Sequence, residues 1–124
     1  MDSRSPMSVF NTQMINFVIE LTEMYPNDTN FKAVYSGLML LKKTNPRLIS
    51  DSFKEFVYPF RKEILEKNEK LFLEMDFKEY TNRHQNGLLI MKTLKGYWKE
   101  LSNESKECMW TYFRVLIVLC DKIK

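Results

Sequence analysis

The chain has 124 residues, the length of one domain, because a division into two cores would leave each too small to bury enough apolar surface. Its residues are 44% hydrophobic and 14% aromatic, with three glycines and four prolines, a composition that excludes an intrinsically disordered chain. Lysine and arginine number 19 against 16 acidic residues, so the net charge of +3 is below what a dedicated nucleic-acid-binding protein carries.

Residues 1–8 form a short polar stretch that contains Pro6, and we expect a flexible leader there. The remaining residues, 9–124, are expected to form a single helical domain. Its first apolar stripe starts at Phe10 and recurs at every third or fourth position, which predicts a helix. Pro26 breaks this pattern and is expected to end the helix.

A second helix is predicted to start at a cap provided by Asn27 or Asp28, whose side chains accept hydrogen bonds from backbone N–H groups in a first helical turn. Its apolar stripe consists of Phe31, Val34, Tyr35, Leu38 and Leu41. Lys42 and Lys43 follow in the expected last turn, where the helix dipole favours positive charge. Pro46 disfavours helical conformation in the residue before it, so the helix is predicted to end there.

The third helix is predicted to open at Ser50 or Ser52 as its capping residue. Its apolar stripe consists of Phe53, Phe56, Val57, Phe60 and Ile64. Pro59 lies inside this stripe, where it removes a backbone donor and clashes with the preceding turn, so the helix either kinks or gives way to a new helix close by. We expect a kink. Further along, the TNRHQNG segment at 81–87 has the composition of a loop.

Two more helices complete the chain. One is predicted from about Leu88 to Leu101, and the other follows a turn in which Ser102 is the capping residue. The last helix has apolar residues on nearly all sides, including Val115 and Val118, which predicts a central position or a partner that covers it. Strand-type alternation is absent, so the expected fold is all-α, a compact bundle of about five helices with a proline-kinked third helix.

The KNEKLFLEMDF segment at 67–77 mixes apolar and acidic residues and is a candidate for an acidic active site or a metal site. The carboxylates in and beside it are Glu66, Glu69, Glu74, Asp76 and Glu79. Because lysines are interleaved with these acids and no histidine, cysteine or glycine pattern converges on them, we expect a solvated face. Phe72 and its apolar neighbours are instead expected to pin this connection onto the core.

Cysteine and histidine give no catalytic or metal-binding pattern. Cys108 and Cys120 fall on one predicted helix about 18 Å apart, which excludes a disulfide between them, and Cys120 is expected in the core. His84, the single histidine, lies in a polar loop and is expected to be a surface residue. We therefore expect no catalytic residue, no metal and no cofactor, and a protein that is not an enzyme.

The chain also lacks the signals that direct proteins across or into membranes. Its N-terminus has no basic stretch followed by an apolar run, so it does not have the pattern of a signal peptide. Its longest apolar run is far below the about 20 residues that a membrane-spanning helix needs. An intracellular, reducing compartment and no membrane span are therefore expected.

Three aromatic residues are candidate anchors for a protein partner. Tyr58, Tyr97 and Trp110 do not all fit the apolar stripes, and exposed aromatic rings often dominate the energy of protein interfaces. Placement of these rings in the core is the alternative, and it is the one that we favour.

For nucleic acid, the candidate patch consists of Lys42, Lys43 and Arg47, to which Arg61 and Lys62 could add. Positive charge at a helix end is explained equally well by capping and solubility. Nucleic-acid contact is therefore the second hypothesis, behind a protein partner.

Three segments of the sequence resemble those of a known group of proteins: FNTQMINFVIELTEMYPND at 10–28, LKKTNPRLISDSFKEFVYPFRKEILEKNEKLFLEMDF at 41–77, and LKGYWKELSNESKECMWTYFRVLIVL at 94–119. In these segments the chain resembles small uncharacterised proteins encoded by nucleocytoplasmic large DNA viruses of algae and protists. The resemblance implies a viral context, in the virion or in the viral factory of the host cell. It assigns no catalytic or binding residue.

Two functions fit this context. The first is a non-enzymatic helical structural or protein-interaction module, a minor component of the virion or of its assembly machinery, which binds a viral protein or a second copy of itself. The alternative is a weakly basic nucleic-acid-associated factor that acts in viral genome packaging or transcription.

Overall fold

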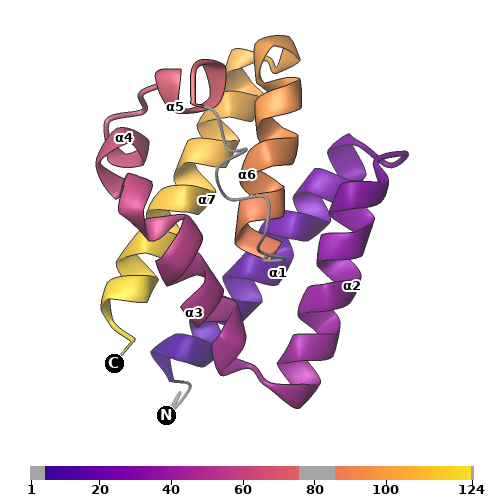
Figure 1. Cartoon of the computed structure of the whole chain (residues 1–124), viewed down its shortest axis with the longest axis vertical. Coiled ribbons are helices and arrows are strands. Elements are labelled where there is room, and N and C mark those ends of the chain that lie inside the picture. The colour runs from indigo at the N-terminus through magenta and orange to yellow at the C-terminus, as the bar shows by residue number, and fades with distance from the viewer. Residues whose placement is uncertain (1–4, 76–85, 124) are drawn as a thin grey trace.

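The computed structural model describes residues 5–75 and 86–123, and every regular element within these ranges is helical (Figure 1). The elements are α1 (Pro6–Met24), α2 (Thr29–Thr44), α3 (Arg47–Phe56), a 3-10 turn (Tyr58–Phe60), α4 (Arg61–Leu65), α5 (Lys70–Leu73), α6 (Asn86–Tyr97), a further 3-10 turn (Trp98–Glu100) and α7 (Asn103–Asp121). The all-α prediction is confirmed, although the described ranges contain seven α-helices rather than about five.

The first helix begins earlier than expected. The Ser5 hydroxyl accepts a hydrogen bond from the Ser8 N–H at 3.1 Å, and Pro6 occupies the first turn, where its missing N–H costs nothing. The predicted leader boundary at residue 8 is therefore too late, because 6–8 already belong to α1.

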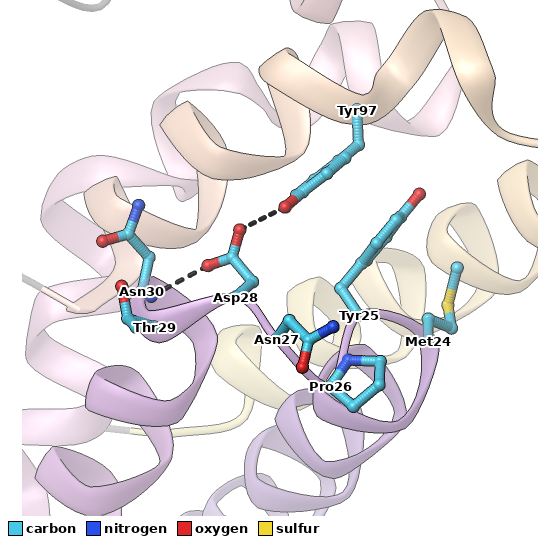
Figure 2. A pocket seen from close by; sticks show the side chains of 8 residues that line it. All are labelled: Met24, Tyr25, Pro26, Asn27, Asp28, Thr29, Asn30 and Tyr97. Atoms are coloured by element: carbon cyan, nitrogen blue, oxygen red, sulfur yellow. Dashed lines mark hydrogen bonds between the residues drawn. The ribbon is translucent and has the colours of Figure 1, made fainter.

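The second helix is capped by Asp28, one of the two predicted residues (Figure 2). One carboxylate oxygen of Asp28 accepts hydrogen bonds from the N–H groups of Asn30 and Phe31, at 2.8 and 3.2 Å. These bonds satisfy two backbone donors that the helix itself leaves unpaired, and they fix the point at which α2 starts.

The predicted kink at Pro59 is instead a break between two helices. α3 ends at Phe56, Pro59 lies in the 3-10 turn, and α4 is a new helix. Because proline has no N–H and its ring crowds the preceding turn, the chain tightens here, and the Phe60 N–H donates to the Val57 carbonyl at 2.9 Å. The prediction of one continuous third helix is therefore wrong.

The start of α3 also differs from the prediction. The helix begins at Arg47, directly after Pro46, whose φ of −61° already suits a helical turn. Ser50 and Ser52, the predicted caps, lie inside the helix with buried side chains. Ser50 Oγ donates to the Arg47 carbonyl at 3.1 Å, a bond typical of serine within a helix.

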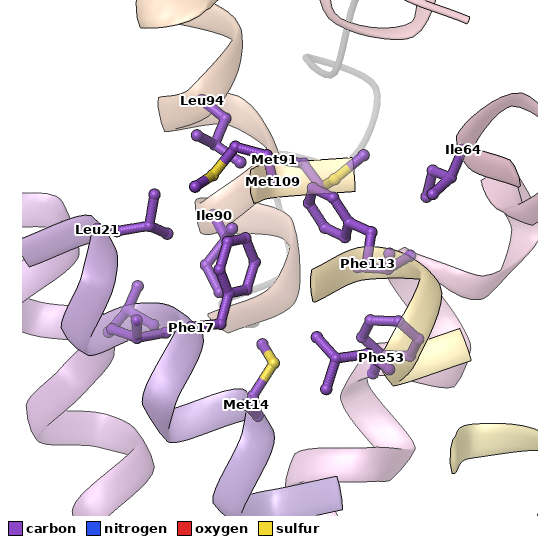
Figure 3. Close-up of a cluster of buried hydrophobic side chains, with 14 of the residues drawn as sticks. Met14, Phe17, Leu21, Phe53, Ile64, Ile90, Met91, Leu94, Met109 and Phe113 are labelled. Atoms are coloured by element: carbon purple, nitrogen blue, oxygen red, sulfur yellow. The ribbon is translucent and has the colours of Figure 1, made fainter. Parts of the chain in front are cut away.

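The helices pack around a single cluster of buried hydrophobic residues to which every α-helix contributes. α1 and α2 run antiparallel, α1 also packs against α7, and α6 lies against α2 and α3 (Figure 1). Side chains from α1, α3, α4, α6 and α7 converge in this cluster (Figure 3).

The last helix is buried along one face and exposed along another. Its buried residues are Met109, Trp110, Phe113, Leu116, Ile117 and Cys120. Val115 and Val118 lie outside this set and are 36% and 47% exposed. The described residues therefore do not bury this helix on all sides, and cover of its exposed face by a partner stays a prediction.

The expected burial of Phe72 is confirmed. Its side chain is 1% exposed, and its ring stacks on Trp98 with 4.3 Å between ring centroids and lies 5.7 Å from Trp110. These contacts hold the short helix α5 against the junction of α6 and α7. The apolar residues of the KNEKLFLEMDF segment therefore do fix this connection to the core.

Candidate functional site

Trp110, a predicted partner anchor, lies in the core. Its side chain is 4% exposed and makes an edge-to-face contact with Trp98, with 4.9 Å between ring centroids. The prediction of a freely exposed anchor is therefore wrong, and the favoured alternative, core placement, is confirmed for this residue.

Tyr58 is half-buried and uses both its ring and its hydroxyl within the chain. The hydroxyl donates a hydrogen bond to the Asp121 carboxylate at the end of α7, and the Arg61 guanidinium lies 4.5 Å from the ring centroid. The hydrogen bond to Asp121 raises the pKa of Tyr58. Tyr58 thus fixes the 3-10 turn to the end of α7 and does not present a free aromatic surface.

Tyr97, the third predicted anchor, lines a hollow of about 390 Å³ at the turn between α1 and α2 (Figure 2). Its ring stacks on Tyr25 with 3.8 Å between ring centroids, and its hydroxyl donates to one oxygen of Asp28. Because the other oxygen of Asp28 caps α2, a single carboxylate joins the start of α2 to the end of α6.

This hollow contains no activated group. The hydrogen bond to Asp28 raises the pKa of Tyr97 to about 12, and burial, followed by the negative charge of Glu100, raises the pKa of Tyr25. Both phenols are therefore protonated at neutral pH and can act only as weak donors, not as bases or nucleophiles. The hydrogen bond and the stacked rings in this hollow hold the ends of helices together.

A second concave site is a groove of about 250 Å³ between α4 and α7. Ile64 and Trp110 are buried and form its apolar base, while Leu65 beside them is 49% exposed. The other lining residues are Lys67, Glu107, Thr111 and Arg114, all exposed. The α4–α7 groove therefore combines an apolar base with a polar and charged rim.

Lys67 occupies the rim of this groove in an unusual backbone conformation. Its φ of 53° is in the left-handed region, which no other non-glycine residue adopts in the part of the chain that the structure describes. The Lys67 N–H donates to the Ile64 carbonyl at 3.0 Å, and the Asn68 N–H donates to the Glu63 carbonyl at 2.8 Å. This pair of bonds defines a Schellman motif, in which glycine is the usual residue at the position of Lys67.

The ammonium group of Lys67 lies across the groove from α4. It contacts the Glu107 carboxylate on α7 at 2.7 Å, so one strained residue links the two walls of the groove. Sequence reasoning missed Leu65, Lys67 and Arg114 as site residues. The only local signal was that Leu65 falls outside the apolar stripe of its own segment.

The predicted nucleic-acid patch lies at the corner between α2 and α3. Lys42 and Lys43 are exposed in the last turn of α2, and Arg47 begins α3. The Arg47 guanidinium lies 3.8 Å from the Asp51 carboxylate, which offsets part of its charge. The two basic residues at the start of α4 are separated from Arg47 along the chain by the full length of α3.

The carboxylates of the KNEKLFLEMDF region do not assemble a site. Glu66 and Glu74 are exposed, and Asp76 and Glu79 lie outside the described residues. Glu69 has a structural role that the sequence did not indicate, because it accepts a hydrogen bond from Trp98 Nε1 at 3.1 Å and pairs with Lys106 at 2.8 Å. Within 5–75 and 86–123, no cluster of histidine, cysteine or acidic residues is arranged to hold a metal ion.

The cysteines are not activated. Cys120 is buried as predicted, Cys108 is half-buried, and both are free thiols. Burial raises the pKa of each thiol, so the reactive thiolate is disfavoured. His84 lies outside the described residues.

Among the helices that the structure describes, none is long and apolar enough to cross a membrane. Comparison of the chain with models of protein families, with curated proteins and with solved structures gives no match.

Proposed function

We propose that this protein is a non-enzymatic helical interaction module that binds a protein partner in the α4–α7 groove. The observation that carries the proposal is the half-exposed Leu65 above the buried Trp110, within a rim of charged residues. An apolar centre surrounded by polar residues is the usual anatomy of a protein interface.

The charges of the rim favour a particular kind of partner segment. Lys67 and Glu107 neutralise each other, whereas Arg114 makes no hydrogen bond or ion pair with any residue that the structure describes. The groove therefore suits a segment that places an apolar side chain against Leu65 and a carboxylate against Arg114. The left-handed Lys67 supports the same site, because backbone strain of this kind concentrates where function requires it.

The proposal is tested with surface substitutions that leave the core intact. Leu65→Asp and Arg114→Glu each place negative charge in the groove, and Leu40→Asp, at a residue 62% exposed on α2, is the matched control. The tagged full-length chain and each variant are used for affinity capture from the native cells, and the retained proteins are quantified by mass spectrometry. Circular dichroism verifies that each variant is folded, and sedimentation velocity measures self-association.

The expected result is a protein partner, or a second copy of the chain, that is retained by the wild type and by Leu40→Asp but lost with Leu65→Asp and Arg114→Glu. If the Leu65→Asp variant keeps every partner that the wild type binds, and self-association is also unchanged, the groove is not the binding site.

The resemblance to proteins of large DNA viruses provides a setting for this proposal. In that setting the partner is a component of the virion or of its assembly machinery, and the chain is a minor component of the same assembly. Quantitative mass spectrometry of purified particles, alongside fractions of infected cells, tests the setting separately from the groove. Absence of the chain from both the particles and the assembly fractions would contradict it.

A further inference from the structure

A third concave site lies on another face of the molecule, between α5 and the exposed side of α6. It is a hollow of about 380 Å³ lined by Phe72, Leu73, Lys92, Lys95, Gly96 and Lys99. The three lysines recur at spacings of three and four, so they share one side of the helical segment, opposite its buried residues. No acidic side chain is among the lining residues.

Among the residues that the structure describes, the ammonium groups of this lysine hollow have few partners. Lys95 Nζ donates to the Phe72 carbonyl at 3.3 Å, which leaves two of its protons for another acceptor. Lys92 and Lys99 make no hydrogen bond or ion pair with the residues that the structure describes. Like charges three and four residues apart on a helix repel one another. An anion bound between the lysines would reduce this electrostatic repulsion in the folded chain.

Gly96 lies between the lysines, and the fold does not require a glycine there. Its φ is not positive, and apart from its chain neighbours and the backbone of its own helix, no atom lies within 4 Å of the place that a Cβ atom would take. A glycine inside a helix is less favourable than alanine, so this position gives up helix stability without any gain in packing. The consequence of the missing side chain is that the space between Lys92, Lys95 and Lys99 stays open.

We propose that the lysine hollow binds a small anionic ligand that carries two or more phosphate groups, a function beyond the partner groove. The backbones of Lys92 and Lys99 are about 10 Å apart along the helix axis, and their long side chains can each reach one phosphate of a ligand held between them. The hollow has the volume of a small-molecule site.

Titration calorimetry of the full-length chain with inorganic pyrophosphate as the probe tests the charge requirement. The Lys92→Gln/Lys99→Gln double variant removes two charges from the hollow, and Lys42→Gln/Lys43→Gln removes the same charge at the distant end of α2. We expect saturable binding of one pyrophosphate to the wild type, roughly tenfold or more weaker in the first variant and unchanged in the second.

Gly96→Leu tests the shape of the hollow without changing its charge. Leucine favours the helix and has open space for its first atoms, so the melting temperature is expected to be maintained while pyrophosphate binding is lost. A single-stranded oligonucleotide is titrated in parallel to separate a polymer from a small ligand. The proposal is overturned if pyrophosphate shows no saturable binding at low salt, if both double variants weaken it equally, if Gly96→Leu leaves it unchanged, or if only the oligonucleotide binds through Lys92 and Lys99.

Discussion

Phe72 provides a stability test at the level of one side chain. Because its ring is buried and stacked on Trp98, Phe72→Ala removes apolar contacts and leaves a cavity between α5 and α6. We expect a loss of about 3–5 kcal/mol in the free energy of unfolding, measured by urea denaturation. Glu74→Gln, at an exposed residue in the same segment, is the control and is expected to change it by less than about 0.5 kcal/mol. A larger loss from Glu74→Gln would restore the acidic residues as a candidate site.

Tyr97 is expected to make the stability of the protein sensitive to alkaline pH. Its pKa is about 12 in the folded chain, above the ordinary value of 10.0, because its hydroxyl donates to Asp28. A raised pKa means that the protonated phenol stabilises the fold, so this contribution is complete below pH 10 and is lost as the pH rises toward 12. The measurement is the melting temperature as a function of pH for the wild type and for Tyr97→Phe.

Tyr97→Phe keeps the ring that stacks on Tyr25 and removes only the hydroxyl. We expect it to be less stable than the wild type at neutral pH, and the difference between the two to shrink as the pH rises above 10. The other tyrosines and the lysines titrate in both proteins, so their contribution cancels in this comparison. A difference that stays constant up to pH 12 would show that the phenol of Tyr97 does not titrate with folding.

At the level of a helix, α5 depends on Glu69 for its attachment to the end of α6. The hydrogen bonds from Lys106 and then from Trp98 lower the pKa of Glu69 below its ordinary value of 4.5. A lowered pKa means that the ionised carboxylate stabilises the fold, so this contribution is present above pH 4.5 and is lost as the pH falls through the folded value.

Glu69→Gln keeps an acceptor for the Trp98 indole and removes the ion pair with Lys106. Because the Glu69 side chain is 44% exposed, the expected loss of stability at pH 7 is small, about 0–1 kcal/mol. The variant should also lose less stability than the wild type between pH 5 and pH 3, measured by thermal unfolding. Equal acid sensitivity of the two proteins would contradict this role of Glu69.

The helices show which parts of the fold follow from local sequence. The apolar stripes predicted α1, α2, α6 and α7, because the helical spacing of apolar residues is a property of each segment alone. The division at Pro59 did not follow, because a proline within an apolar stripe is compatible with both a kink and a break. The local pattern alone does not distinguish the two.

For the whole molecule, the candidate sites were harder to predict than the core. Trp110 was recognised as ambiguous from its position on the helix, but its neighbours Trp98 and Phe72 come from other elements. The α4–α7 groove likewise exists only because two segments about 40 residues apart in the sequence meet, as the contact between Lys67 and Glu107 shows. Periodicity reports which face of a helix is buried, and it carries no information about which two exposed faces will form a groove.

All the α-helices share a single cluster of buried residues, so we expect the chain to unfold cooperatively. Trp98 and Trp110 are adjacent at the junction of α5, α6 and α7, so tryptophan fluorescence reports on that region alone. Far-ultraviolet circular dichroism reports on every helix, including α1, α2 and α3. If the predicted single domain over 9–124 is correct, the core cannot be lost in parts, and we expect both signals to follow one urea transition with the same midpoint.

Two substitutions in different parts of the core, Phe72→Ala and Leu21→Ala, test whether the whole molecule unfolds as one unit. Phe72 belongs to the tryptophan region and Leu21 is a buried residue of α1. In a cooperative domain, a given substitution shifts the fluorescence midpoint and the circular dichroism midpoint equally, because the loss of any core contact destabilises the one folded state. The size of the shift can differ between the two substitutions. If Leu21→Ala instead shifts the circular dichroism midpoint and leaves the fluorescence midpoint in place, the α1–α2 pair unfolds separately from the α5–α7 region, and the chain has two cooperative units.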